Sequence, residues 1–592
     1  MTYETESKKA VRVPVRIVEI DLPYCLNTLG TAPCTSLQTG DSKCFNSRCL
    51  GSNDCGDVTN FNAGVKTYRF CEDIGLDIPG AIPCIPQGSI NITQPKLPYL
   101  GGLGTRSVAS IKLKDFTWAD LGIDKYLSDR TYDPSEQGTY FGKLRARNPF
   151  YRGATARILD GFWTEDFSLD NFTTMYFIFD KFNGPSGGSK SEVTFTFKDI
   201  LIKSFGGESV YPKPGTAKIA TAVLDTGLGT VTVDAGTAAG YPTSFYGNIG
   251  TEVLSLTYPG SGDVFTLVAR SLFGTEAEEH DIGAIIQVGL WYDAWNVMDV
   301  FKNILQYGCN IPLANIDTTD IDYEKNNWYE VAPVTRYIGL PMPCDEMLDR
   351  LGITSAFNMW TDISSGKVRC RAIRPTQETI TTYSDDYNLI AETASTEDST
   401  NDRVTTVIVW YGLRNPVESD TETKNYYAWS AWSDDEYKTL YGDEDRVKNV
   451  FAPWLTRDQH LEATSLANSI IARSKLTPSV VRFDLDAKDG VGIELGAPIR
   501  VESKINQTPT GVANTKALQV LGKTAINKKN KLSHFSITAM DYQFDARLFI
   551  LMDTADEPDY EDSSEDEKDR GGYLCDDSDV FPVSGDAGYK LS

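Results

Sequence analysis

The sequence is poor in histidine and has no long apolar runs. Its 592 residues include three histidines, His280, His460 and His534, which argues against a histidine-rich catalytic metal site. No stretch of about 18 apolar residues occurs, so the sequence predicts no transmembrane helix. The first residues carry charges but neither a continuous apolar segment nor a small-residue cleavage site. This start is not that of a secretory signal and predicts folding in a reducing cytosol.

The common catalytic signatures are missing as well. The chain contains no H-E-x-x-H pair and no Walker loop. His280, in EAEEHDIGA, could be a ligand or a base, but a turn or surface histidine is the simpler interpretation. The DDSD run at 576–579 could bind calcium or form a solvated acidic loop. The sequence therefore predicts a protein that is not an enzyme.

Positive charge is also scarce. There are 56 Lys and Arg residues against 82 Asp and Glu, which gives a formal net charge of −26. Such a chain does not hold DNA or RNA by neutralising phosphates. DNA could still pass along a wall of like charge, because repulsion prevents it from sticking.

Cysteine, in contrast, is concentrated in one segment. Seven of the eleven cysteines lie between positions 25 and 84, namely Cys25, Cys34, Cys44, Cys49, Cys55, Cys71 and Cys84. The segment is rich in Gly, Pro, Asn, Asp and Ser, and loops of this kind need a covalent or metal link to hold them together. The absence of C-x-x-C weakens a zinc ribbon or a ferredoxin motif. An iron–sulfur cluster, zinc, disulfides and buried thiols all remain open alternatives.

The residue pattern predicts a mainly β fold with α+β modules, a multidomain mosaic of small β-barrels or sandwiches with a few short helices. Aromatic residues make up 11% of the chain, and Thr, Val and Tyr are frequent. Alternating apolar positions predict strands, and helical periodicity predicts helices. The expected strands are 11–20, 110–118, 157–163, 175–182, 192–203, 404–411, 480–487 and 534–544, and the expected helices are 295–307, 344–351 and 456–474.

Composition shifts divide the chain into six expected segments. Residues 554–572 are polar and acidic, which predicts a solvated linker before a short tail. The expected segments are an N-terminal strand with the Cys-rich loops (1–95), a β-barrel domain (96–212), a small β domain (213–292), an α+β domain (293–400), a C-terminal β-barrel or α+β domain (401–552) and the acidic linker with a docking tail (553–592).

Adjacent aromatic residues occur at two places. Trp291–Tyr292 and Tyr426–Tyr427 could stack on sugars, or they could belong to a core or an interface. The second use is the commoner one, so these pairs alone do not predict a binding site.

Three stretches together resemble the baseplate hub, or tail-tip hub, of siphophages, the bacteriophages with long non-contractile tails. The first is RVPVRIVEIDLPYC with the cysteines that follow it, up to AIPC. The second runs from SVASIKLKDF to ARILDGFW (107–163), and the third is GNIGTEVLSLTYPGSGDVFTLVARSLFGTEAEEHDIGAIIQ (247–287). The C-terminal half is similar to the hub scaffold shared with contractile tails, and the acidic tail departs from the family pattern.

The resemblance implies a structural role in the virion. Such hubs are homotrimers that close the distal tail tube and join the distal tail protein to a central fibre or tip protein. The tape measure protein and the viral DNA would be further partners, and the DNA would pass through the lumen without specific binding. The protein would be made in the host cytoplasm and would function at the tail tip during genome ejection.

The resemblance also implies a cofactor. Some tail-tip hubs hold a four-iron, 4Fe-4S cluster on cysteines. By position, Cys25, Cys34, Cys44, Cys55, Cys71 and Cys84 match the group pattern, and Cys49 is an extra cysteine. Within the six, we favour Cys44, Cys55, Cys71 and Cys84 as ligands, because they bracket the loops that most need fixing.

Two other functional classes compete with the hub. A tail-associated cell-wall hydrolase would need a buried carboxylate or a Cys–His pair in a cleft, and the sequence shows neither clearly. A carbohydrate-binding receptor adhesin would bind glycans as an isolated chain.

Overall fold

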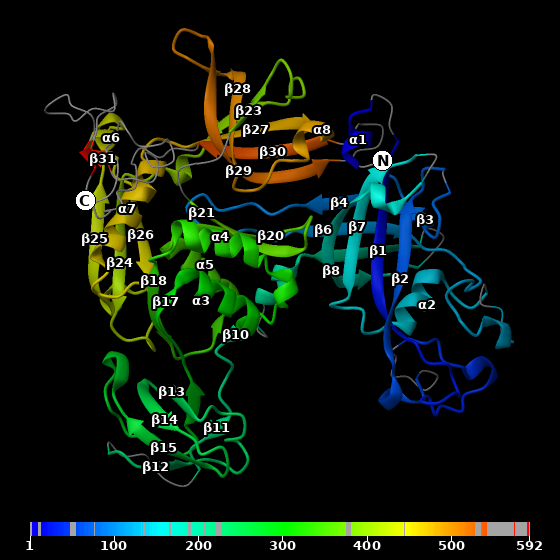
Figure 1. Cartoon of the computed structure of the whole chain (residues 1–592), viewed down its shortest axis with the longest axis horizontal. Coiled ribbons are helices and arrows are strands. Elements are labelled where there is room, and N and C mark those ends of the chain that lie inside the picture. Colours follow the sequence, from blue (N-terminus) through cyan, green and yellow to red (C-terminus); the bar gives the residue numbers. More distant parts are fainter. Residues whose placement is uncertain are drawn as a thin grey trace.

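The structure is a computed structural model of the whole chain. It describes residues 3–9, 13–47, 55–75, 77–131, 133, 136–164, 167–187, 191–205, 209–220, 227–373, 380–442, 444–526, 534–541, 573–574 and 589–590. The chain is mainly β, with many small sheets and a few short helices, as the residue pattern predicts. Figure 1 shows these sheets as separate bodies around a central helical layer.

The N-terminal part of the chain forms one large sheet. Eight strands pair in the order β3-β2-β1-β7-β8-β9-β6-β4, and edge strand β3 also contacts β6, so the sheet curls toward itself. The strands are β1 (Pro14–Cys25), β2 (Ala63–Glu72), β3 (Ile82–Ile85), β4 (Ile90–Thr93), β6 (Val108–Lys114), β7 (Thr155–Phe162), β8 (Thr173–Asn183) and β9 (Glu192–Lys198).

This sheet differs from the expected division at 95/96. Strands β1 to β4 come before that boundary and β6 to β9 come after it, yet they share one ladder. The reason is that β1 pairs with the distant β7, with Ile17 opposite Leu159. Apolar side chains from both halves, such as Phe70, Phe179 and Phe195, fill a common core. The N-terminal strand and the following β domain are therefore one folded unit.

A helical segment covers the end of this sheet nearest the Cys-rich loops. Helix α2 (Tyr140–Arg147) begins at Thr139, whose hydroxyl accepts a hydrogen bond from the Gly142 amide at 3.3 Å. The rings of Tyr140 and Phe141 pack against Phe70. The short helix α1 (Tyr3–Ser7) contacts β7 elsewhere on the sheet.

Residues 217–288 form a small separate sheet. Six strands pair in the order β11-β16-β13-β14-β15-β12, and in Figure 1 they project below the rest of the chain. They are β11 (Ala217–Lys218), β12 (Thr230–Thr232), β13 (Ser244–Ile249), β14 (Glu252–Thr257), β15 (Val264–Ala269) and β16 (Ile285–Val288). The chain enters and leaves this sheet side by side, since Ala217 pairs with Ile286.

A helical layer occupies the centre of the molecule. Its buried side chains, among them Phe301, Leu348 and Phe357, form one core between three short sheets. The helices are α3 (Val297–Asn303), continued by a π-helical turn (Ile304–Gly308), α4 (Thr318–Trp328) and α5 (Cys344–Thr354). The sheets are β21-β20-β5, β17-β18 and β10-β19, built from β5 (Gly102–Leu103), β10 (Val210–Tyr211), β17 (Leu290–Asn296), β18 (Pro333–Ile338), β19 (Met342–Pro343), β20 (Phe357–Asp362) and β21 (Lys367–Ala372).

Two larger sheets lie in the described part of the C-terminal half, in addition to the two-stranded ladder β31-β32. The first has the order β22-β28-β29-β30-β27-β23. The second has the order β25-β24-β26, and helix α7 (His460–Ser474) packs on β24 and β25. The strands are β22 (Thr381–Ser384), β23 (Ser395–Asp398), β24 (Thr406–Leu413), β25 (Tyr426–Ser433), β26 (Val447–Ala452), β27 (Ser479–Asp486), β28 (Pro498–Gln507), β29 (Ala513–Ile526) and β30 (His534–Asp541). The remaining elements are α6 (Asp435–Leu440), α8 (Ala487–Gly490), β31 (Tyr573–Leu574) and β32 (Tyr589–Lys590).

The boundary expected at 400/401 falls inside the first of these sheets. Strands β22 and β23 come before it, but they pair with β28 and β27. The capping box expected to open a helix at Thr456 forms only in part. The Gln459 side chain accepts a hydrogen bond from the Thr456 amide at 2.8 Å, but α7 begins at His460, and its N-cap Gln459 makes no side-chain capping bond. Within the described residues, no helix is long and apolar enough to cross a membrane.

Candidate functional site

The Cys-rich loop connects β1 to β2 at one end of the N-terminal sheet. The two strands pair antiparallel up to Cys25 and Ala63, and the loop spans residues 26–62. It contains two single helical turns, Gly40–Ser42 and Val58–Asn60. The β ladder therefore fixes both ends of a long, irregular segment.

Four cysteines of this region line one cavity. Cys25 is the last residue of β1, and Cys34, Cys44 and Cys55 come from three separate parts of the loop. All four are partly exposed, and none of the nine described cysteines forms a disulfide. The loop thus brings together thiols that are up to 30 positions apart in the sequence.

Two polar side chains hold the walls of the cavity. The Asn46 side chain donates to the carbonyls of Cys25 and Asn27, at 3.0 and 3.2 Å. Asp57 accepts from the Thr35 amide at 2.8 Å and from its hydroxyl at 2.9 Å. These hydrogen bonds lower the pKa of Asp57 to about 2. Its carboxylate therefore stays ionised and can accept them across the physiological pH range.

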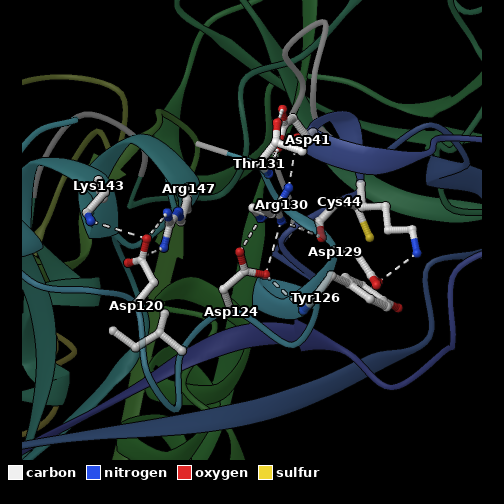
Figure 2. Close-up of polar contacts among 12 residues, drawn as sticks. Asp41, Cys44, Asp120, Asp124, Tyr126, Asp129, Arg130, Thr131, Lys143 and Arg147 are labelled. Atoms are coloured by element: carbon white, nitrogen blue, oxygen red, sulfur yellow. Dashed lines mark hydrogen bonds and ion pairs between the residues drawn. The ribbon is translucent and has the colours of Figure 1, made fainter. Parts of the chain in front are cut away.

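A buried charge network anchors the loop to the rest of the domain (Figure 2). Arg130 pairs with Asp124, both side chains being fully buried, and also donates to the Asp41 carbonyl at 2.8 Å. The guanidinium groups of Arg130 and Arg147 lie 4.0 and 4.1 Å from the ring centre of Phe45, the neighbour of Cys44. Sequence reasoning missed these residues, because an arginine far along the chain gives no local sign of its partner.

Cys71 and Cys84 lie away from this cavity. Cys71 pairs with Ile17 on β1, eight residues before Cys25, which corresponds to about 26 Å of extended strand. Cys84, in β3, packs into the main core of the sheet, whereas Cys71 packs into a separate small cluster. The structure thus does not bring together the favoured set Cys44, Cys55, Cys71 and Cys84, and instead groups Cys44 and Cys55 with Cys25 and Cys34.

Burial affects the ionisation of three of the thiols, Cys44, Cys55 and Cys71. It raises the pKa of Cys44 and of Cys55, and it raises that of Cys71 to about 11. A metal or cluster binds the thiolate form and would displace these protons.

We expect Cys71 to make the stability depend on alkaline pH. Its pKa is 9.0 in the unfolded reference and about 11 in the fold, so its stabilising contribution is complete below pH 9 and declines as the pH rises toward 11. The Cys71→Ala variant lacks this pH-dependent contribution to stability. The difference in unfolding free energy between the parent chain and the variant, measured with urea, should shrink by about 1 kcal/mol from pH 8 to pH 10. A difference that is constant with pH would contradict the assignment.

A single zinc ion and a multi-iron cluster require different spacings of four thiols. A tetrahedral zinc ion at about 2.3 Å from each sulfur needs the sulfurs within about 4 Å of one another. In the described part of the chain, no three His, Cys, Asp or Glu side chains lie close enough to hold one metal ion. Four thiols around a shared cavity match a cluster whose four corners each take one thiolate.

The other histidine considered from the sequence belongs to a small ion-pair network. His280 is buried and its Nε2 lies 2.9 Å from a Glu252 oxygen, which Arg270 also contacts. This triad holds the strand ends of the small sheet together. Cys49 and the 576–579 run lie outside the described residues.

No known protein-family profile matches the chain, and no curated protein matches it significantly. Solved structures do. Among the solved structures similar to it are tail proteins, two of them from prophages.

Three of them cover most of both chains. The 43 kDa tail protein of prophage MuSo2 from Shewanella oneidensis has 10% identity and a TM-score of 0.36, over 76% of this chain and 92% of that one. A tail protein from Neisseria meningitidis has 9% identity and a TM-score of 0.36, over 77% of this chain and 92% of that one. A prophage tail protein from Listeria monocytogenes has 8% identity and a TM-score of 0.31, over 77% of this chain and 89% of that one.

Proposed function

We propose that this chain is the structural hub subunit of a siphophage tail tip. In this role three copies close the distal tail tube, join the distal tail protein above to a central fibre or tip protein below, and form the channel for the genome. The sequence resemblance over residues 10–550 supports this role, and so does the mosaic of small sheets.

One observation carries the proposal. The first two stretches that resemble tail hubs are separate in the sequence, yet they fold into a single curled sheet with the cysteine cavity at its end. Strand β1 belongs to the first stretch and β7 to the second, and they pair over seven positions from Pro14 to Ile20. Two motifs that suggest the same family from different positions thus build one structural unit.

We further propose that Cys25, Cys34, Cys44 and Cys55 hold a 4Fe-4S cluster. Bound there, the cluster would supply a rigid cross-link between four loop segments. The residues of the chain do the rest: Asn46 and Asp57 fix the cavity walls, and Arg130 fixes Cys44 through its carbonyl at 3.4 Å. A structural role follows, because the described residues of the loop include no buried apolar side chain.

The charge of the chain suits a channel for DNA. Three copies at −26 each would carry a large negative charge, and a wall of that sign does not retain phosphates. Electrostatics of this kind predicts passage of the DNA rather than binding.

The hub role predicts the mass of the purified protein. We expect a trimer of about three times the 65.4 kDa chain mass in mass photometry, and a threefold ring at the tail end in particle images. A stable monomer that clears peptidoglycan in a zymogram would contradict the proposal and favour the cell-wall hydrolase. A monomer that binds glycans and never joins tail tubes would favour the adhesin.

A further inference from the structure

One face of the three-stranded sheet β25-β24-β26 is aromatic and exposed. Helix α7 packs on β24 and β25, and Val407 and Val409 belong to the core on that side. On the opposite side, Trp410 and Trp429 pair across the two strands with ring centres 6.5 Å apart. Trp429 is 60% exposed, and Tyr427, two residues before it on the same side, is 49% exposed. We call Trp410, Tyr427 and Trp429 the aromatic face.

The strands that carry the aromatic face contain no charge. Neither β24 nor β25, of eight residues each, includes an Asp, Glu, Lys or Arg, whereas charged residues make up 23% of the chain. Strand β25 is also the last strand of its ladder and, within the described residues, pairs with β24 alone. Exposed edge strands and exposed aromatic clusters are both places where another segment can pack.

Two arginines lie at one end of the aromatic face. The guanidinium groups of Arg414 and Arg457 lie 4.8 and 5.5 Å from the ring centre of Tyr427, and both side chains are exposed. Arg414 uses its Nε to donate to the Tyr426 carbonyl at 2.9 Å. In the part of the chain that the structure describes, neither arginine has a carboxylate within ion-pair distance. The surface therefore fits a partner that is both acidic and aromatic.

The C-terminal segment of this chain, residues 542–592, has that composition. From position 553 it contains fourteen Asp and Glu residues against three Lys and Arg, together with four aromatic residues, Tyr560, Tyr573, Phe581 and Tyr589. Within it the structure describes one ladder, in which β31 pairs with β32. A two-stranded hairpin of this kind is marginally stable in water by itself, so a surface to pack on would stabilise it.

The C-terminal segment begins close to the aromatic face. The Tyr99 hydroxyl lies 2.5 Å from the Arg473 carbonyl oxygen and 3.4 Å from that of Asp541, the last residue of β30. Arg473 lies in the last turn of α7, which packs on β25 and whose 15 residues measure about 22 Å. A chain of the length of residues 542–572 spans about 30 Å on average, which is enough to reach the face. Figure 1 draws β31 at the same end of the longest axis as β25.

We propose that the C-terminal segment docks on the aromatic face of its own chain. The acidic run at 556–569 would lie against Arg414 and Arg457, and the β31-β32 hairpin would cover Trp410 and Trp429. The tether gives the segment an effective concentration on the order of millimolar, which favours it over a free acidic partner. This proposal stands apart from the cluster and from the hub role.

The test is hydroxyl-radical labelling of the folded protein before and after removal of the segment. A site for a specific protease, inserted between residues 552 and 553, allows the removal without refolding. We expect Trp429 to be labelled about tenfold faster once the segment is gone, the protection given by a docking free energy of about 1.4 kcal/mol. Trp295, which is 42% exposed on β17 and outside the aromatic face, should be labelled at the same rate in both forms.

Two substitutions in the full chain test the role of charge. Arg457→Gln should lower the protection of Trp429 several-fold, because an arginine–carboxylate contact is lost. Arg482→Gln is the matched control, since Arg482 forms an exposed ion pair with Glu397 at 2.6 Å, and it should leave the protection unchanged. Added salt should weaken the protection in the parent chain more than in Arg457→Gln.

Three results would overturn the proposal. Fast labelling of Trp429 in both forms would mean that the face stays open. Slow labelling in both forms would mean that another surface covers it, and a rise in rate on dilution would identify that surface as a second copy of the chain. Full protection in Arg457→Gln at every salt concentration would mean that the acidic run does not pair with the arginines.

Discussion

Serine at any one of Cys25, Cys34, Cys44 or Cys55 should abolish the iron content of the protein. Protein purified without oxygen should be brown and hold about four irons per chain if all four thiols ligate one cluster. A Cys44→Ser chain should be colourless and contain almost no iron, because one missing corner exposes the cluster to loss. Iron analysis and visible absorbance of the two proteins measure this directly.

The matched control is Cys84→Ser. Cys84 follows Cys55 in the sequence and matches the same family pattern, but it is 2% exposed within the core of the sheet. This variant should keep its iron, although it should be less stable because a polar hydroxyl replaces a buried thiol. Loss of iron in Cys84→Ser with full retention in Cys44→Ser would reject the ligand set. Colourless parent protein with mapped disulfides would reject the cluster itself.

The difference between these cysteines was readable in part from the sequence. Cys71 and Cys84 stand in YRFCED and AIPCIP, where apolar neighbours indicate strands and buried thiols. Cys34, Cys44 and Cys55 stand among Gly, Ser, Asn and Asp, which indicates loops. The spacing of the cysteines alone does not show which lie in strands and which lie in loops. Only the pairing of β1 with β2 shows that Cys71 lies far from Cys25 along the ladder.

Removing the partner of Arg130 should loosen the cysteine loop. In Asp124→Ala a fully buried guanidinium group loses its carboxylate, and breaking a buried pair in this way costs about 3–5 kcal/mol. Arg130 also holds the carbonyls of Asp41 and Cys44, so the cost should fall on the loop. Hydrogen exchange of the amides in residues 25–47 of the full chain measures the free energy of this local opening.

A surface pair provides the comparison. Lys114 and Asp73 lie 3.9 Å apart with side chains 60% and 53% exposed. Asp73→Asn should change the free energy of opening, measured from exchange of the same amides, by less than about 1 kcal/mol, since exposed pairs contribute little. If Asp124→Ala had no larger effect than Asp73→Asn, the buried network would not be what docks the loop.

Local structure was more predictable than the way the pieces join. Alternation of Val193, Phe195 and Phe197 predicted β9, and the apolar face at Val297, Val300 and Phe301 predicted α3. The periodicity of a strand does not name its partner, so the long-range pairing of β1 with β7 could not be foreseen. Helix α4 was missed because its mean apolar content is low, and its start depends on the Asp317 side chain, which accepts from the Asp320 amide.

The aromatic pairs show the same limit. Trp291 and Tyr427 each stand next to another aromatic residue in the sequence. Nothing in the sequence indicates that these two residues lie near each other in the fold. They line the same pocket from β17 and β25, because the small sheet and the C-terminal half meet there. A pocket at a junction between folded units becomes visible only when the units are assembled.

The entry and exit of residues 217–288 lie side by side. The Gln287 side chain accepts from the Gly215 amide at 2.7 Å and donates to the Lys213 carbonyl at 2.8 Å, so the two crossing points are tied together. A short turn could close the chain at this point, at little cost in loop entropy. Evolution can therefore exchange this unit for another by recombination at two neighbouring positions, and leave the cysteine loop and the central helices intact.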